Sequence, residues 1–286
     1  GCIGMGQAPA TDGNSLRTVP RNFPGRSGTK EDRVFLCSPE TATASALRGE
    51  ITDPRDLDMA YPDVAEPEQR ASWNEELLIA PLPPDQAREV ALEKGPNIVT
   101  LPELDPLPDT MELPVLLKVG SDISTDEIMP AGSDVLPYRS NIPKISAFVF
   151  GQVDESYPER AREHREDSGH AVVGGTNYGQ GSSREHAAIA PRYLGLRMVL
   201  VKGFARIHHQ NLINFGVLPA IFRDPDDYDA IEQGDTLRVM GIREAVETGS
   251  DLEVENVMKG ETYRVEAPMS AREREILLAG GVTNWV

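Results

Sequence analysis

Short apolar runs alternate with helix-forming stretches along the C-terminal half of the chain. The apolar runs predict strands at residues 115–119, 172–174, 198–201 and 218–222. The stretches between them predict helices over residues 141–150, 184–194 and 205–215. Shorter strands are expected near residues 237–240, 252–254 and 262–265, before a helix that Ser270 caps and Gly280-Gly281 ends. Strands alternating with helices and followed by an antiparallel tail predict a compact α/β domain.

The N-terminal part of the chain differs in its pattern of predicted elements and in its composition. Residues 1–50 indicate α/β structure, with a helix that starts after Ser38, has Pro39 in its first position, reaches Arg48 and ends at Gly49. Residues 50–112 are rich in Pro, Asp and Glu, and prolines interrupt them too often for long elements. A short helix or an extended strand fits residues 85–94. We expect an ordered linker that wraps a surface, with flexible disorder as the alternative.

The stretch from Gly174 to Ala190 carries most of the chemical information. An apolar run leads into a glycine-rich turn, which ends in Gly-Ser-Ser-Arg immediately before the predicted helix. A helix N-terminus offers unpaired N–H groups and the positive end of a dipole, so it can bind an anion or stabilise a serine alkoxide. The local alternative is a helix capped by serine after a glycine turn.

Gly-Gly-Thr-Asn-Tyr-Gly-Gln-Gly-Ser-Ser-Arg-Glu-His-Ala-Ala resembles the active-site signature of the aconitase superfamily. Further segments resemble that family in the same order. They are Gly1–Gly4 with Arg21–Arg26 and Ser38–Ala42, then Asp122–Asp126 with its continuation to Ile142, and Lys202–His208 with Asn211–Gly216. The resemblance covers nearly the whole chain and is weakest across about residues 50–110. Several long motifs in the right order are more specific than a single glycine pattern.

The resemblance implies a domain organisation. Family members that carry a cluster have four domains, and this chain corresponds to their C-terminal portion. Residues 1–60 would be the end of the third, α/β/α cluster domain, and residues 61–112 an extended, acidic, Pro-rich linker. Residues 113–286 would form the compact β/β/α swivel domain.

The resemblance also implies an activity. Aconitate hydratase converts citrate to isocitrate through cis-aconitate, which requires a base, a Lewis acid for the departing hydroxyl and cations for the carboxylates. On the matching positions, Ser182 would be the base and Asp126 would orient a partner or tune ionisation, with a turn or cap aspartate as the alternative. The residues expected to bind the tricarboxylate substrate are Arg21, Arg26, Arg139, Ser183 and Arg184. His186 would support the helix.

Cysteine use bears on the cofactor. In its Gly-Cys-Ile-Gly context, Cys2 resembles the last of three cysteines that hold the family's [4Fe–4S] cluster, and the other two are not in this chain. We therefore expect the cluster in the complete enzyme but not on this chain alone, which would be inactive. The N-terminal aconitase domains, in the same polypeptide or a separate subunit, would be the partner. Cys37, in an apolar run, is expected to be a structural thiol.

Composition narrows the class of protein. The net charge of -18 argues against nucleic-acid binding, although a local arginine cluster can still bind anionic substrates. No apolar run is long enough to predict a membrane span, and no secretory signal is visible. Two cysteines in 286 residues indicate a reducing compartment, and we expect a cytoplasmic location.

Three functions remain open. Arg139 would hold a third carboxylate and favours aconitate hydratase. A sister hydro-lyase of the isopropylmalate or homoaconitate type is the second possibility, and a non-catalytic fragment that binds carboxylates or a partner is the third. Pro20, where the family usually has Asn, and Gly203, where many relatives have Ser, depart from the pattern.

Overall fold

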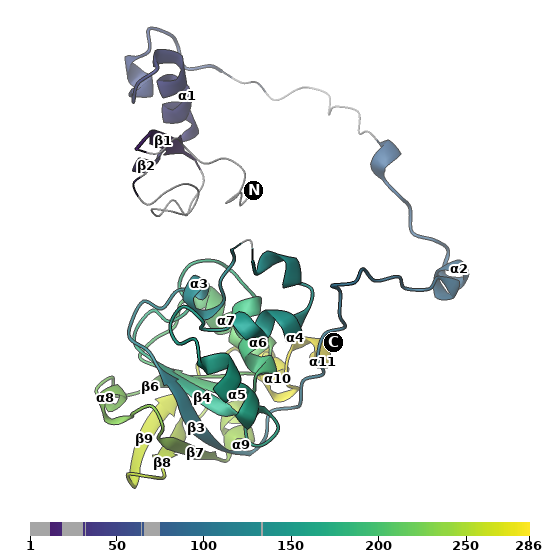
Figure 1. Ribbon diagram of the computed structural model, residues 1–286, viewed down its shortest axis with the longest axis vertical. Coiled ribbons are helices and arrows are strands. Elements are labelled where there is room, and N and C mark those ends of the chain that lie inside the picture. Colours follow the sequence, from purple (N-terminus) through teal and green to yellow (C-terminus); the bar gives the residue numbers. More distant parts are fainter. Residues whose placement is uncertain (1–11, 19–30, 32, 64, 66–74, 133) are drawn as a thin grey trace. The chain divides into compact units, whose positions relative to one another are not determined.

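The computed structural model describes residues 12–18, 31, 33–63, 65, 75–132 and 134–286 (Figure 1). Its contacts divide the chain into two units, Gly1–Pro84 and Asp85–Val286. The division falls inside the stretch 61–112 that the sequence predicts to be a linker. Each unit is described by itself.

The described part of the first unit consists of a parallel strand pair and a helix. Strand β1 (Asn14–Arg17) pairs with β2 (Arg33–Leu36), and α1 (Pro39–Arg48) follows. Ser38 Oγ accepts a hydrogen bond from Thr41 N at 3.1 Å, and Gly49 ends the helix with a φ of 79°. These are the start and end that the sequence predicts. Cys37 is half-buried and free. Two short 3₁₀ turns, η1 (Pro54–Asp56) and η2 (Glu75–Leu77), complete the unit.

A closed barrel of seven strands forms the centre of the second unit. Its order is β3-β4-β5-β6-β9-β8-β7. The strands are β3 (Thr110–Lys118), β4 (His170–Gly174), β5 (Leu196–Val201), β6 (Leu218–Phe222), β7 (Thr236–Met240), β8 (Leu252–Asn256) and β9 (Glu261–Glu266). The first four pair in parallel, and every pairing that involves β7, β8 or β9 is antiparallel. The predicted α/β class with an antiparallel tail is therefore confirmed.

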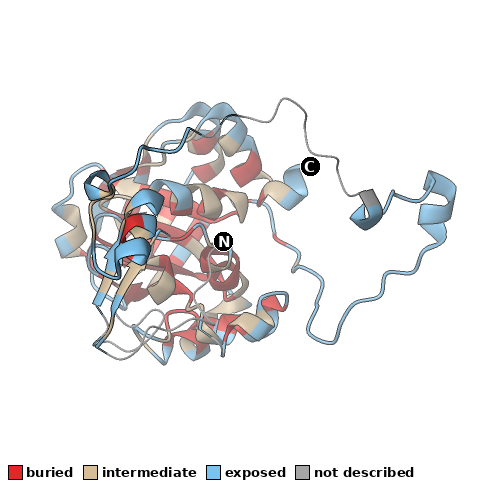
Figure 2. Ribbon diagram, turned by 90° about the horizontal axis from the view of Figure 1, so that it is seen from above, coloured by how far each residue is buried: buried red, intermediate tan, exposed pale blue. Residues whose placement is uncertain are grey.

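The parallel strands separate two hydrophobic cores. On β5, Leu196, Val199 and Val201 pack toward the helices, whereas Met198 and Leu200 pack inside the barrel. Burial on both faces explains why this strand is a nearly continuous apolar run. Figure 1 shows α3, α4, α6 and α7 gathered on one side of the parallel strands and the β8–β9 hairpin beyond the other, and Figure 2 shows the buried strands in red within the unit.

The helices of the second unit are mostly short. They are α2 (Pro84–Glu89), α3 (Thr125–Ile128), η3 (Leu136–Tyr138), α4 (Ile142–Ile145), η4 (Ser146–Phe148), α5 (Tyr157–Arg165), α6 (His186–Tyr193), α7 (Arg206–Asn214), α8 (Asp227–Ala230), α9 (Ile242–Thr248), α10 (Ala271–Leu278) and α11 (Val282–Trp285). The expected helix over residues 141–150 is the pair α4 and η4. The sequence does not predict α5, because it is mostly charged and buries little besides Tyr157, Pro158 and Ala161. Among the described residues no helix combines the length and apolar character needed to cross a membrane.

The end of the Pro-rich stretch packs onto the barrel unit. Leu104 and Leu107 are buried, Leu107 N donates to Leu278 O at 3.3 Å, and Asn284 Nδ2 donates to Leu104 O at 2.6 Å. Residues 102–107 therefore form an ordered strap, whereas most side chains of residues 75–101 are exposed.

The loops that follow β3 and β4 lie side by side at the carboxyl ends of these strands. Gly175 N donates to Gly120 O at 3.0 Å, Gly179 N donates to Ile123 O at 2.8 Å, and Thr125 N donates to Gln180 O at 2.8 Å. Ligand sites in α/β sheets typically occur at these strand ends. The ladder of main-chain bonds places the glycine-rich signature against residues 120–125.

Replacing Gly179 with alanine should disrupt this arrangement. Gly179 has a φ of 80°, and a Cβ there would lie 2.2 Å from the buried ring of His208. Gly260 has a similar φ of 67° but open space around it, so Gly260→Ala isolates the backbone cost. We expect Gly260→Ala to lower the free energy of unfolding by about 1 kcal/mol and Gly179→Ala by about 3 kcal/mol or more. Equal losses in urea unfolding would show that the close approach to His208 is not a constraint.

Two buried histidines should make stability depend on pH. Burial lowers the pKa of both His170 and His208 to about 3, from 6.5. The folded protein therefore keeps them neutral, while the unfolded chain takes up protons as the pH falls below 6.5. The stability that depends on keeping these two histidines neutral is fully present above that pH and is lost as the pH falls toward 3. Between pH 7 and pH 5 each histidine should lower the free energy of unfolding by about 2 kcal/mol.

His208→Leu provides the control. Both of its ring nitrogens are buried without a hydrogen-bond partner among the described residues, so a leucine there removes the titration without breaking a bond. Urea unfolding of this variant should show a loss between pH 7 and pH 5 that is about 2 kcal/mol smaller than the loss in the parent. The same pH dependence in variant and parent would contradict the assignment.

Candidate active site

Ser182 is enclosed by the paired loops. Ser182 as a whole is 4% exposed, and its Oγ is buried without a hydrogen-bond partner among the described residues. Thr125 Oγ1 donates to the Ser182 carbonyl at 3.2 Å, which fixes the main chain and leaves the hydroxyl unused. An unpaired buried hydroxyl is uncommon, because its desolvation is not compensated.

The helix after the signature starts later than the sequence predicts. Helix α6 begins at His186 with Glu185 as its N-cap, and no side chain makes a capping hydrogen bond. The predicted start at Arg184 and the interpretation of the serine as a helix cap are therefore wrong. The turn of Gly181, with a φ of 101°, holds Ser182 in an irregular segment just before the helix. Ser183 in the same segment is exposed.

Asp126 and Arg184 form an ion pair across the two loops. Arg184 Nη1 lies 2.6 Å from Asp126 Oδ1 and donates to Met129 O at 3.0 Å. The Asp126 side chain is 37% exposed and that of Arg184 is 17% exposed. Asp126 does not cap its helix, because Ser124 and Glu127 form the capping box of α3. Both contacts use Nη1, and Arg184 Nη2 and Nε make no hydrogen bond with a described residue.

Arg139 lies beside the start of α6. His186 Nε2 donates to the main-chain oxygen of Arg139 at 2.7 Å. The Arg139 side chain is exposed and makes no hydrogen bond or ion pair with any described residue. The contact through His186 thus places the main chain of Arg139 beside the start of the helix that follows Ser182–Arg184.

A second side-chain contact joins the loops and is not predicted from the sequence. Asp122 and Asn177 are non-glycine residues with left-handed backbone, at φ of 63° and 55°. Asn177 Nδ2 donates to Asp122 Oδ1 at 2.8 Å, and Gln180 Nε2 donates to Asp122 O at 2.7 Å. Asn and Asp tolerate this conformation better than other non-glycine residues. Their presence inside two of the motifs is the signal that could have revealed the contact.

Under the site, α7 presents a neutral imidazole. His208 is 1% exposed, and its ring lies 5.5 Å from that of Tyr178, centroid to centroid. Burial raises the pKa of Tyr178 and lowers that of His208, so neither is charged at neutral pH. These two motif residues therefore support the loop by packing.

The described residues do not fit an iron–sulfur cluster. They contain no group of three or more His, Cys, Asp or Glu that could hold a metal ion. Cys2, Arg21 and Arg26 lie outside the described residues, so the structure does not place them relative to Ser182. Of the predicted site residues, it brings together Asp126 and Arg184, with Ser182 and Arg139 held beside them through Thr125 and His186.

Residues 147–225 match the family model described as the aconitase C-terminal domain. A putative mitochondrial aconitate hydratase from Emericella nidulans is 32% identical over 96% of the chain and 39% of its own length. Mitochondrial homocitrate dehydratase from Saccharomyces cerevisiae is 30% identical over 93% of the chain and 39% of its own length. The chain thus spans about two fifths of these relatives.

The compartment named for these relatives contradicts a prediction. Aconitate hydratases from several eukaryotes that match at 31–33% identity are named mitochondrial. The expected cytoplasmic location is therefore wrong as an inference from composition. The number of cysteines does not distinguish the cytosol from other reducing compartments.

A solved structure supports the same relationship. The crystal structure of 3-isopropylmalate dehydratase from Methanocaldococcus jannaschii is 33% identical and superposes with a TM-score of 0.51. The match covers 92% of that protein and 62% of this chain. Together with the family match and the signature around Ser182, these similarities show that the chain belongs to the aconitase superfamily and corresponds to the C-terminal portion of its members.

Proposed function

We propose that this chain is the base-bearing, carboxylate-binding part of a hydro-lyase that interconverts citrate and isocitrate through cis-aconitate. The observation that carries the proposal is the cluster of unused polar groups at the paired loops. The Ser182 hydroxyl, the free edge of Arg184 and the whole Arg139 guanidinium have no partner among the described residues. Such groups favour a ligand that supplies the missing hydrogen bonds.

The two arginines would bind substrate carboxylates. Asp126 holds Arg184 through one nitrogen, which orients the guanidinium and leaves Nη2 and Nε as a two-pronged donor. A planar fork of this kind matches a carboxylate. Ser183, exposed in the next turn, would donate to the same group, and Arg139 would hold another carboxylate.

Ser182 would take the carbon-bound proton. Its Oγ is covered by the surrounding loops, so the side chain or the loops would have to move for the oxygen to reach the substrate. The positive charge of Arg184 and the main-chain N–H groups at the start of α6 would stabilise the alkoxide. Asp126 would tune that field by partly neutralising Arg184.

The substrate distinguishes the proposal from its nearest alternative. Citrate has three carboxylates, and the exposed, unpaired Arg139 supports a third carboxylate contact. The similarity to a homocitrate dehydratase and to an isopropylmalate dehydratase supports the sister hydro-lyases as the second candidate. Isopropylmalate carries an apolar group at the corresponding position and would leave Arg139 without a partner.

Activity would require the rest of the enzyme. The described residues have no ligand set for a cluster, and the chain spans about two fifths of its relatives. We propose that N-terminal aconitase domains, covalently linked or separate, supply the cluster and the remaining site residues. Without them the chain would act only as a carboxylate-binding fragment.

Ser182→Ala tests the assignment of the base. In the complete enzyme the variant should exchange the substrate's carbon-bound hydrogen with solvent about 10² to 10⁴-fold more slowly. The melting temperature should stay the same or rise, because the lost hydroxyl makes no hydrogen bond to a described residue. Ser183→Ala is the matched control and should mainly raise KM. Wild-type exchange in the Ser182 variant, with cluster content intact, would refute this role.

Arg139→Lys tests the choice of substrate. A point charge replaces a two-pronged donor, so kcat/KM for citrate should fall by about one to two powers of ten. Arg162→Lys, at an exposed position of α5, should leave citrate turnover unchanged. Steady-state kinetics on citrate, isocitrate, homocitrate and isopropylmalate provide the measurement. Faster wild-type turnover of isopropylmalate, with no effect of Arg139→Lys, would favour the sister hydro-lyase.

A further inference from the structure

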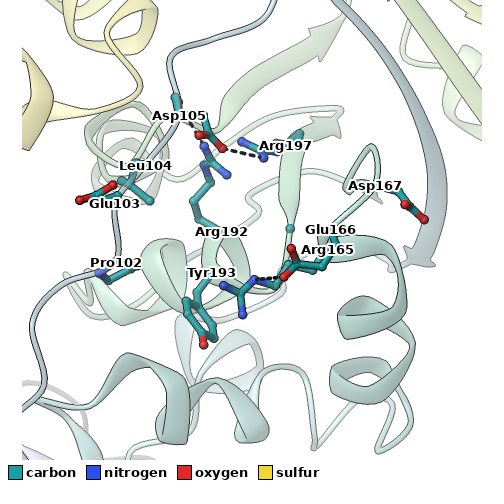
Figure 3. A pocket seen from close by; sticks show the side chains of 11 residues that line it. Pro102, Glu103, Leu104, Asp105, Arg165, Glu166, Asp167, Arg192, Tyr193 and Arg197 are labelled. Atoms are coloured by element: carbon teal, nitrogen blue, oxygen red, sulfur yellow. Dashed lines mark hydrogen bonds and ion pairs between the residues drawn. The ribbon is translucent and has the colours of Figure 1, made fainter.

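A polar pocket lies at the opposite end of α6 from the candidate active site. Its volume is about 290 Å³, and three segments and a helix end form its walls. These are the strap at Pro102–Asp105, the end of α5 with the residues that follow it (Arg165–Asp167), the C-terminal end of α6 and the start of β5. Figure 3 shows Arg165, Arg192 and Arg197 in this pocket, which we call the arginine pocket. Its size is at the lower end for ligand sites and suits a small molecule.

Arg192 brings a buried charge that is not neutralised by a carboxylate contact. The residue is 5% exposed, and its one hydrogen bond to a described residue runs from Nη2 to Asp105 O at 3.3 Å. Its Nε is buried without a partner among the described residues. Burial, together with the nearby charge of Arg197, lowers the pKa of Arg192 to about 9. A buried guanidinium is costly unless a negative group compensates it.

The other two guanidinium groups are also weakly paired. Arg197 Nη2 lies 3.3 Å from Asp105 Oδ2, and the Asp105 side chain is 80% exposed, so the pair is screened by water. Arg165 Nε lies 3.7 Å from Glu166 Oε1, beyond hydrogen-bond distance. The Arg165 guanidinium instead lies 4.0 Å over the Tyr193 ring, which orients it toward the pocket.

Arginines elsewhere in the same unit are paired more fully. Arg223 binds both oxygens of Asp251, at 3.1 and 2.8 Å, and Arg238 contacts Glu112 at 2.9 Å and Glu255 at 3.1 Å. No arginine of the pocket makes a two-pronged contact with a carboxylate. The pocket therefore holds an excess of unused N–H donors.

Negative groups also line the pocket and limit its affinity. Figure 3 shows Glu103 and Asp167 at opposite margins, with their carboxylates away from the Arg192 guanidinium. The carbonyl ends of α5 and α6 contribute partial negative charge near the arginines. These groups predict affinity in the micromolar to millimolar range and a strong dependence on ionic strength.

We propose that the arginine pocket binds a small multivalent oxyanion, either inorganic phosphate or a short polycarboxylate. The anion would accept hydrogen bonds from Arg165 and Arg197 and would compensate the charge of Arg192. It would also join the strap to the end of α6, whose other end follows the Ser182 segment. The site is separate from the carboxylate-binding loops, so it does not depend on the proposed function.

Calorimetric titration of the 286-residue chain with inorganic phosphate, and separately with citrate, tests the proposal at low salt. Arg165→Gln and Arg197→Gln avoid removing the buried Arg192, and each should weaken binding about tenfold, since each removes one charged hydrogen bond. The double variant should lose detectable phosphate binding while keeping the parent's circular dichroism. Citrate can also bind at the candidate active site, so its loss is expected only when the double variant is combined with Arg184→Gln. Arg223→Gln is the matched control, because Arg223 lies outside the pocket and is paired with both oxygens of Asp251. This variant should bind the anion like the parent.

Arg184→Gln separates the two sites. Binding that survives this change but is lost in the double variant supports the arginine pocket, and the tighter of the two anions identifies its ligand class. Binding lost in Arg184→Gln but unchanged in the double variant places the anion at the candidate active site and overturns the proposal. No binding of either anion at about 10 mM, where a millimolar site is mostly filled, also overturns it.

Discussion

Main-chain pairing between the loops after β3 and β4 is the constraint on which the candidate site depends. These loops bond to each other beyond the ends of their strands, with Thr125 N and Gln180 O 2.8 Å apart at the last step. Only a glycine fits at position 179, because the buried ring of His208 lies directly against it. The ladder therefore sets the separation between α3 and the signature segment, and the Asp126–Arg184 ion pair forms at its end.

The two ends of α6 lie beside different groups of residues. Its N-terminal end follows the irregular segment with Ser182, and its C-terminal end carries Arg192 beneath the strap. The apolar residues of the helix pack in the same core as β5 and the neighbouring helices. Strap residues 102–107 come from a region that sequence composition alone would place in a linker. Their buried leucines show that the packed unit begins before β3.

Sequence patterns predicted the elements whose signals are local. The cap at Ser38, the stop at Gly49 and the buried strand β5 depend on neighbouring residues and on burial of both faces. The sequence could not reveal α5, whose charged surface hides its small buried face, or the closure of the sheet, which requires β3 to pair with β7 across more than a hundred residues. The start of α6 was predicted too early, because Ser-Ser-Arg-Glu has the composition of a helix start and the turn at Gly181 prevents it.

For the candidate site, too, the sequence indicates which residues belong together, whereas the structure shows how they contact one another. The motifs identified Ser182, Asp126, Arg139 and Arg184 as a group. Only the structure shows which of their atoms already make hydrogen bonds or ion pairs within the protein. Asp126 takes one nitrogen of Arg184 and leaves the other donors for a ligand, while His186 contacts the main chain of Arg139 and leaves its guanidinium free. A site that satisfied every donor internally would bind substrate only by breaking bonds. Here the contact with Asp126 orients Arg184 and leaves its other donors available, as the proposed carboxylate-binding site requires.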